Sequence, residues 1–193
     1  MSLEPGGYAD KLGNRYEGRW VARQLLMVLQ ERIRTVTIEA VGDEEEGVDL
    51  WIEWPDGRRQ AQQCKVENGP RPEWSLANLN ARGVLHHAAN QLGRTACTFG
   101  FVSSVPAVVL RDLSRSARDS AGDSEDYFRD QVVALGTHRR KGFDQFCHYL
   151  SLDPTQVADR AAILKNLALL LMQHIILLSA SVVQAVRLAL IRA

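Results

Sequence analysis

The sequence predicts a mixed α/β domain, and three features of the chain support this prediction. Near the start, apolar residues recur at steps of three and four, which is typical of an amphipathic helix. Residues 35–67 contain three short runs in which apolar and polar residues alternate, as they do in strands. A second helical segment and a fourth, more apolar strand follow. The expected order is therefore helix, three strands, helix, strand, with a helical C-terminal extension.

The first helix is expected from Asn14 to about Arg32. Its apolar residues are Tyr16, Trp20, Val21, Leu25, Leu26, Leu29 and Ile33. Asn14 is a suitable N-cap, which would place Glu17 at the third helical position and complete the spacing of a capping box. Residues 1–13 are rich in glycine, and we expect them to be irregular.

Three strands are expected in "TVTIEAVG", "VDLWIEW" and "RRQAQQCKVE", which fall within residues 35–67. The acidic loop "DEEE" separates the first two, and a Pro-Asp-Gly turn separates the second from the third. Ser75 is a suitable N-cap for a helix that we expect to continue to Leu92. The run "ACTFGFVSS" predicts a buried strand. Pro106 is expected to open the next helix, where its missing N–H has no cost.

The composition changes after Asp153. Residues 166–186, "NLALLLMQHIILLSASVVQAV", are nearly all apolar and are long enough to cross a membrane. Gln173 and His174 would lie near the centre of such a span, where polar groups are costly, so a buried or self-associating helix is favoured. An accidental tail from a truncated or shifted reading frame stays open as a third interpretation. We therefore divide the chain into a main domain, 1–152, and a helical extension, 153–193.

Charge and cysteine content restrict the function only weakly. Lys plus Arg and Asp plus Glu both number 23, so net charge provides no overall attraction to nucleic acid. Residues 1–75 carry 10 basic and 14 acidic side chains, and the remainder carries 13 and 9, which is compatible with an acidic metal site beside a basic surface. Three scattered cysteines argue against a disulfide framework or a zinc site. Because no secretory signal is evident, a cytoplasmic location is expected.

The hairpin of the second and third strands is expected to bring chemically active residues together. Asp49 stands at the start of one strand, and Gln63 and Lys65 share one face near the end of its neighbour. The first helix can supply Glu17, and the backbone carbonyl of Cys64 adds another oxygen. This all-oxygen donor set suits Mg²⁺, with Mn²⁺ as an alternative metal.

Lys65 would stand beside that metal. There it can orient or deprotonate an attacking water and stabilise charge on a phosphate transition state. A metal that lowers the pKa of the water and clamps phosphate oxygens completes the requirements of phosphodiester hydrolysis. Taken singly, Glu17 could be a helix cap, Asp49 the end of a turn, and Lys65 an exposed edge charge. Their joint occurrence in this order of elements favours an active site.

Two other residue types receive no catalytic interpretation. The Cys64 thiol is expected to face the core. The histidines His86, His87 and His148 have no metal-ligand partners at a useful spacing and are interpreted as surface or core residues.

The motifs Glu17 in "RYEGRW", Asp49 in "GVDL" and Gln63-Cys64-Lys65 in "QQCK" resemble the PD-(D/E)XK nuclease superfamily, in its Mrr-like variant with a Gln-X-Lys motif. The strings "GGYADKLGNRYEGRWVARQLL", "EGVDLWIE", "QQCKVENG", "WSLANL" and "FVSSVPA" are similar to the double-stranded-DNA nuclease domain of bacterial anti-phage effectors. The similarity covers roughly residues 5–152. It implies a restriction-endonuclease-like core with Glu17, Asp49, Gln63 and Cys64 as metal ligands.

This resemblance implies a Mg²⁺-dependent endonuclease that cuts double-stranded DNA with little sequence preference. Cutting both strands needs two active sites, so a homodimer or higher oligomer is expected. The sequence contains no nucleotide-binding motif, so the chain is expected either to work with a separate sensor partner or to be a fragment of a larger machine. Lys11 and the basic run Arg139, Arg140 and Lys141 are candidate contacts to DNA phosphates. The alternatives are a catalytically silent nucleic-acid-binding module on the same fold and a membrane-tethered interaction protein.

Overall fold

The computed structural model describes residues 5–38, 42, 45–67, 72–94, 96–120, 122–134 and 136–174, with the backbone alone at 5–14, 138 and 174. The N-terminal part contains α1 (Pro5–Leu29), β1 (Thr35–Ile38), β2 (Leu50–Glu53), β3 (Arg59–Lys65), α2 (Leu76–Ala81), α3 (Val84–Arg94) and β4 (Thr98–Ser103). It is followed by α4 (Val108–Asp119), α5 (Ser124–Asp126), the π-helical segment η2 (Tyr127–Val133), α6 (Thr137–Tyr149), α7 (Val157–Leu169) and β5 (Leu170–His174).

The five strands form one mixed sheet in the order β1-β2-β3-β4-β5. The first three strands are antiparallel, with Leu50 opposite Gln62, whereas β3, β4 and β5 are parallel, with Lys65 opposite Ser103. Parallel neighbours need a crossover, and α2 with α3 provides it between β3 and β4. The sheet therefore ends its antiparallel hairpin and begins its parallel part at β3.

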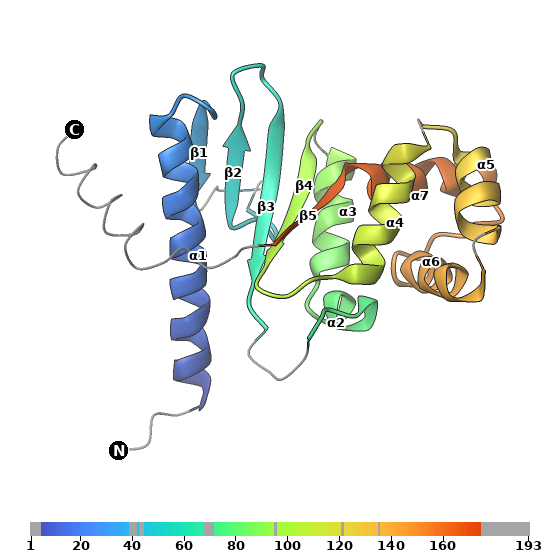
Figure 1. The fold of residues 1–193 in the computed structure, drawn as a ribbon, viewed down its shortest axis with the longest axis horizontal. Helices are drawn as coiled ribbons and strands as arrows, with labels where there is room; N and C mark the ends of the chain where they lie inside the picture. The colour runs from blue at the N-terminus through green and yellow to red at the C-terminus, as the bar shows by residue number, and fades with distance from the viewer. Residues whose placement is uncertain are drawn as a thin grey trace.

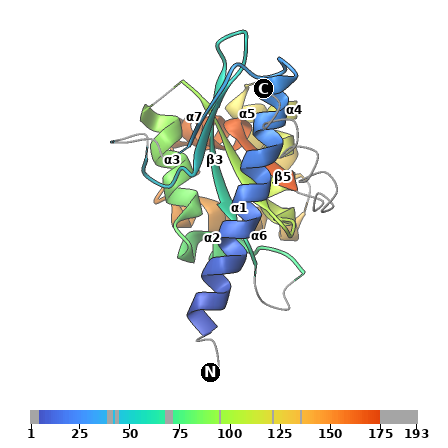
Figure 2. The same ribbon diagram turned by 90° about the vertical axis from the view of Figure 1, so that its left-hand side faces the viewer.

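Helices cover both faces of the sheet (Figure 1). Helix α1 lies across one face, as the view from that side shows, and contacts β1 and β3. Helices α3, α4 and α7 lie on the other face, with α5 and α6 farther from the sheet (Figures 1 and 2). This arrangement is a mixed α/β fold, as the sequence predicts.

The two faces have separate apolar cores because side chains alternate along each strand. On the α1 face, Leu50, Ile52, Cys64 and Val102 pack with Tyr16, Trp20 and Ile33. On the opposite face, Trp51, Ala61, Phe99 and Phe101 join a larger cluster that extends through α3, α4 and α7 to Phe143 and Phe146 of α6. The larger cluster anchors most of the helices, and the smaller one fixes α1 against the strands of the hairpin.

The prediction for the first helix is wrong at its start. Helix α1 begins at Pro5, so residues 5–13 are helical and Asn14 is not an N-cap. Proline is well placed at a helix start, since its absent N–H would have no partner there, and the following glycines only weaken helix propensity. Glu17 consequently lies about three turns inside the helix, and the capping interpretation of Glu17 is wrong as well.

Strands β1 to β4 lie inside the segments expected for them, and Ser75 is confirmed as an N-cap, because its hydroxyl accepts the Asn78 N–H at 3.2 Å. The single helix expected from Ser75 to Leu92 is instead two helices. Gly83, with φ at +73°, separates α2 from α3 in a conformation that other residues rarely adopt.

The helix expected over residues 166–186 is confirmed over residues 166–169 and is wrong over residues 170–174. Helix α7 ends at Leu169, and residues 170–174 form β5, which pairs with the edge of β4. The backbone groups of that edge gain partners, and Leu164, Leu167 and Leu170 join the larger core. Within the described residues, packing therefore continues across the division that was predicted at residue 152. Residues 175–186 lie outside the described part of the chain.

No helix in the described part of the chain combines the length and apolar character needed to cross a membrane.

Candidate metal-binding and catalytic site

The first part of the candidate site is a close backbone arrangement where β2 and β3 meet. The Asp49 N–H donates to the Gln62 carbonyl oxygen at 2.9 Å, which continues the antiparallel pairing one residue before β2 begins. The Cys64 N–H donates to Asp49 Oδ2 at 2.5 Å. A charge-assisted hydrogen bond of this kind fixes the Asp49 carboxylate against the end of β3.

The charges of three side chains influence the Cys64 thiol. Burial raises the pKa of the Cys64 thiol, the negative charges of Asp49 and Glu17 raise it further, and the positive charge of Lys65 lowers it. Such effects require all three charges to lie near the sulfur. The thiol is therefore protonated at neutral pH, and the backbone carbonyl oxygen is the atom of Cys64 that we consider as a candidate ligand.

The cluster extends over both faces at one end of the sheet. Gln63 and Lys65 share a face of β3, and Gln63 contacts α3 on that side. Glu17 approaches from α1, on the face toward which Cys64 packs. Asp49 lies between them because its carboxylate is bound to the Cys64 backbone. The structure therefore brings the four candidate residues to one end of β3.

The side chain of Gln63 is buried and is oriented by a hydrogen bond to His87. Its side chain is only 2% exposed, and its Nε2 lies 3.0 Å from Nδ1 of His87. The amide N–H donates to the imidazole nitrogen, so His87 fixes how the amide group is turned. The other end of the amide, Oε1, is buried and has no hydrogen-bond partner among the described residues. A buried acceptor without a partner is costly, and it is the type of atom that a metal ion or a bound water would complete.

His87 lies in a narrow space bordered by two glycines. A Cβ atom on Gly47 would come within 2.1 Å of His87 Cγ, and one on Gly83 within 2.9 Å of Cε1. Both glycines also have positive φ, at +68° and +73°. The glycine that precedes "VDL" and the glycine between α2 and α3 therefore allow the imidazole to reach Gln63.

The sequence-based interpretation missed His87, which was assigned to the surface or the core. The available signal was its spacing of one helical turn from Gly83, and that signal is weak because it does not indicate the nearness of Gly47. Tyr16 was assigned only to packing. Its hydroxyl is also buried without a partner in the described part of the chain, and burial together with the nearby Cys64 raises its pKa.

The candidate DNA-contacting residues differ in their exposure to solvent. Arg139 is partly buried, and it donates to Ser116 Oγ of α4 at 2.7 Å, so it contributes to the packing of α6 on α4. Arg140 and Lys141 are exposed on α6, and Arg140 lies 3.9 Å from the carboxylate of Asp144. The side chain of Lys11 lies outside the described residues. The structure leaves Arg140 and Lys141 as the accessible members of the basic run.

The donor set fits a hard divalent cation. Asp49 and Glu17 provide carboxylates, Gln63 provides an amide oxygen, and Cys64 provides a carbonyl. The described residues include no cluster of three or more His, Cys, Asp and Glu side chains suited to a metal.

Neither family models, nor curated proteins, nor solved structures provide a match to this chain.

Proposed function

We propose that the chain is a Mg²⁺-dependent endonuclease that hydrolyses phosphodiester bonds of double-stranded DNA. The proposal includes a restriction-endonuclease-like core, formed by α1, β1 to β3, α2 with α3, and β4. The order of these elements and the change from antiparallel to parallel pairing at β3 support that assignment. The motif resemblance described above adds the substrate class.

One observation carries the proposal. Asp49 is bound to the Cys64 backbone, and the charges of Asp49, Glu17 and Lys65 all act on the Cys64 thiol. Two carboxylates and an ammonium group from separate elements therefore lie close enough to one end of β3 to act on the same thiol. A folded protein gains no stability from gathering like charges there, and sites of this kind are commonly functional.

Each residue has a distinct task in this proposal. Asp49 and Glu17 supply negative charge for the metal, and Gln63 adds an oxygen whose direction is set by the hydrogen bond to His87. A bound Mg²⁺ would lower the pKa of a water and neutralise charge on the scissile phosphate. Lys65 orients the attacking water and stabilises the additional negative charge of the transition state.

The biological setting is part of the same proposal. The resemblance to nuclease domains of anti-phage effectors supports a role in bacterial defence, with a sensor partner that controls cleavage. Cutting both strands at one position requires two copies of the site, which supports a homodimer or higher oligomer. Arg140 and Lys141, which are exposed on α6, are the proposed contacts to the DNA backbone.

The decisive experiment is plasmid cleavage by the purified chain in Mg²⁺. Asp49→Asn keeps an oxygen that can accept the Cys64 N–H but removes the charge, and we expect cleavage to fall by at least about 100-fold. Lys65→Met removes the ammonium group, and we expect a loss of about 10²- to 10⁴-fold.

Matched controls are available on α4. Asp119→Asn and Arg115→Met each remove one charge from an exposed ion pair whose atoms are 3.9 Å apart, and both variants should cleave at the rate of the parent chain. If the parent chain binds DNA but does not cut it in Mg²⁺ or Mn²⁺, the function is that of a catalytically silent nucleic-acid-binding module. Equal activity in Asp49→Asn and the parent would also end the nuclease proposal.

A further inference from the structure

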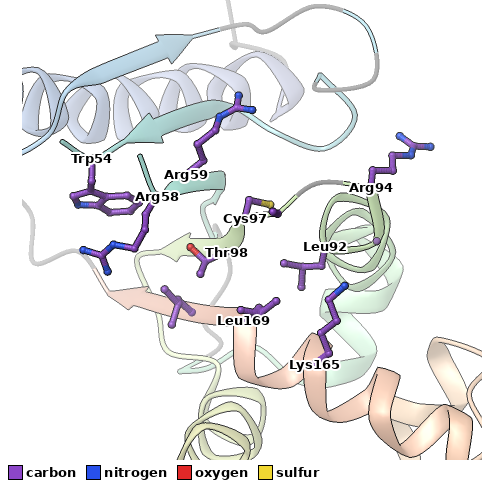
Figure 3. A pocket seen from close by; sticks show the side chains of 12 residues that line it. Trp54, Arg58, Arg59, Leu92, Arg94, Cys97, Thr98, Lys165 and Leu169 are labelled. Atoms are coloured by element: carbon purple, nitrogen blue, oxygen red, sulfur yellow. The ribbon is translucent and has the colours of Figure 1, made fainter. Parts of the chain in front are cut away.

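A second feature with a chemical character of its own lies at the opposite end of the sheet. There, residues after β2, at the start of β3 and β4, and in β5 surround an open hollow of about 600 Å³ (Figure 3). The remaining lining comes from α3 and α7. The hollow is lined by Trp54, Arg58, Arg59, Leu92, Gly93, Arg94, Ala96, Cys97, Thr98, Lys165, Leu169 and Leu171. Asp49 and Lys65 lie at the other ends of β2 and β3, so this hollow is separate from the candidate catalytic site.

The lining combines positive charge with an apolar base. Four cationic side chains border the hollow, and the described lining contains no Asp or Glu. Leu92, Leu169 and Leu171 form much of the apolar surface. Figure 3 shows Lys165 rising from α7 toward Leu92, while Arg58 and Trp54 lie together on the opposite side of the hollow.

Two of the cations form ion pairs with exposed carboxylates. The guanidinium of Arg58 lies 5.6 Å from the centre of the Trp54 ring and 2.6 Å from the carboxylate of Asp56. Arg94 pairs with Glu46 at 2.9 Å, and both of these side chains are nearly half exposed, at 47% and 45%. Exposed ion pairs contribute little to stability, so an anionic ligand can replace these partners at small cost.

We propose that this hollow binds a small organic anion with an apolar body. The body would lie against the leucines and the Trp54 ring, and the negative group would lie beside Lys165. The volume is in the range of small-molecule sites, and apolar walls with a few charged groups are typical of such sites. A nucleotide and an aliphatic carboxylate both share this chemistry.

DNA is a poorer match for the hollow. Contacts to a DNA backbone need exposed cations on an open surface, and an apolar base contributes nothing to them. The proposed ligand instead uses both the charge and the leucines. The site is independent of the nuclease proposal, because it includes neither Asp49 nor Lys65.

The probe for the test is 1-anilinonaphthalene-8-sulfonate, an aromatic sulfonate whose fluorescence rises when it enters an apolar site. We expect saturable binding of one dye per chain. Gly93 lines the hollow, and among the described residues no neighbouring atom lies within 4 Å of a Cβ built there. A Cβ at this position therefore meets no described neighbour, and we expect the ring of Gly93→Phe to obstruct the hollow, so the saturable binding should be lost.

Gly18 provides the matched control, because it is also an exposed helical glycine with no neighbouring described atom within 4 Å of an added Cβ. Gly18→Phe should bind the dye as the parent does. Lys165→Met should weaken binding about two- to fivefold, the size expected for one exposed charge pair, whereas Arg115→Met on α4 should have no effect. Dye binding that persists in Gly93→Phe, or that is lost equally in Gly18→Phe, would overturn the proposal.

Competition with the dye then identifies the chemical class of the natural ligand. Adenosine monophosphate represents aromatic phosphates, and octanoate represents aliphatic carboxylates. Displacement of the dye by one of them at millimolar concentration supports the proposal and assigns the ligand to that class. If neither displaces the dye, the hollow binds it through apolar contact alone, and the proposal of an anion site is wrong.

Discussion

The two ends of β3 differ in how their charges are arranged. At the end near Lys65, acidic and basic side chains lie together, and the amide oxygen of Gln63 is buried without a described partner. At the end near Arg59, the hollow is bordered by cations alone, and two of these are paired with exposed acids outside its lining. These arrangements are the reason we propose a metal cation for the first end and an organic anion for the second.

The comparison shows that the net charge of the chain does not reveal how charges are distributed over its surface. The chain has 23 basic and 23 acidic residues, so its overall charge favours neither kind of ligand. A single strand nevertheless connects two regions of different charge, because different helices, or different ends of α3, supply the side chains around its two ends. Helices α1 and α3 supply Glu17 and His87 at one end, and α3 and α7 supply Arg94 and Lys165 at the other. Variants that change one end and leave the other intact can test the two proposed functions separately.

The largest effect in this comparison is expected from His87→Ala. The variant removes the acceptor that fixes the amide of Gln63, so the amide oxygen loses its preferred direction. Outer groups that orient metal ligands typically contribute about 10- to 100-fold to metal affinity. We expect Mn²⁺ binding, followed by electron paramagnetic resonance, to weaken by that amount. Dye binding at the other end should not change.

His86→Ala is the control for this variant, since His86 is exposed and precedes His87 on the same helix. Its affinity for Mn²⁺ should equal that of the parent. A parent-like affinity in His87→Ala would show that the hydrogen bond to Gln63 has no part in metal binding. The candidate ligand set would then be reduced to the carboxylates and the carbonyl of Cys64.

A smaller effect is expected from Gly47→Ala. Gly47 has φ at +68°, and an added Cβ would overlap His87, so the free energy of unfolding should fall by about 1–3 kcal/mol. Gly57→Ala is a close control, because Gly57 also has positive φ, at +82°, but no described atom lies within 4 Å of its added Cβ. The difference between the two variants in urea unfolding measures the cost of displacing His87.

If Gly47→Ala and Gly57→Ala lower the free energy of unfolding by the same amount, the imidazole of His87 can move aside without cost. The glycine before β2 would then be needed only for its backbone conformation.

Much of this fold was predictable from local patterns. The four expected strands occur where alternation placed them, and Ser75 caps its helix, because strand alternation and capping depend on neighbours in the sequence. The start of α1 was wrong by nine residues, from Asn14 to Pro5, because glycines weaken a helix without preventing it. Strand β5 was also missed, because an apolar run suits a buried helix and a buried strand equally.

The candidate site was also predictable only in part. Asp49, Gln63 and Lys65 were predictable as one group, because the hairpin and the alternation of side chains fix their relative positions. His87 was not predictable. Its contact with Gln63 depends on the packing of α3 against the loop before β2, and that packing requires the absence of side chains at Gly47 and Gly83. Such tertiary contacts leave no periodic signal in the sequence.

The smallest effect in the comparison is expected from Gly93→Ala. Unlike Gly47, Gly93 is helical and exposed, and an added Cβ would meet no neighbouring described atom within 4 Å. Alanine loses less backbone entropy than glycine when a helix forms, so the free energy of unfolding should rise by about 0.5 kcal/mol. Thermal unfolding should show an increase in Tm of about 1–2 °C. A fall in Tm would mean that the end of α3 beside the hollow requires glycine, as the loop before β2 does. The hollow would then be more tightly packed than its lining indicates.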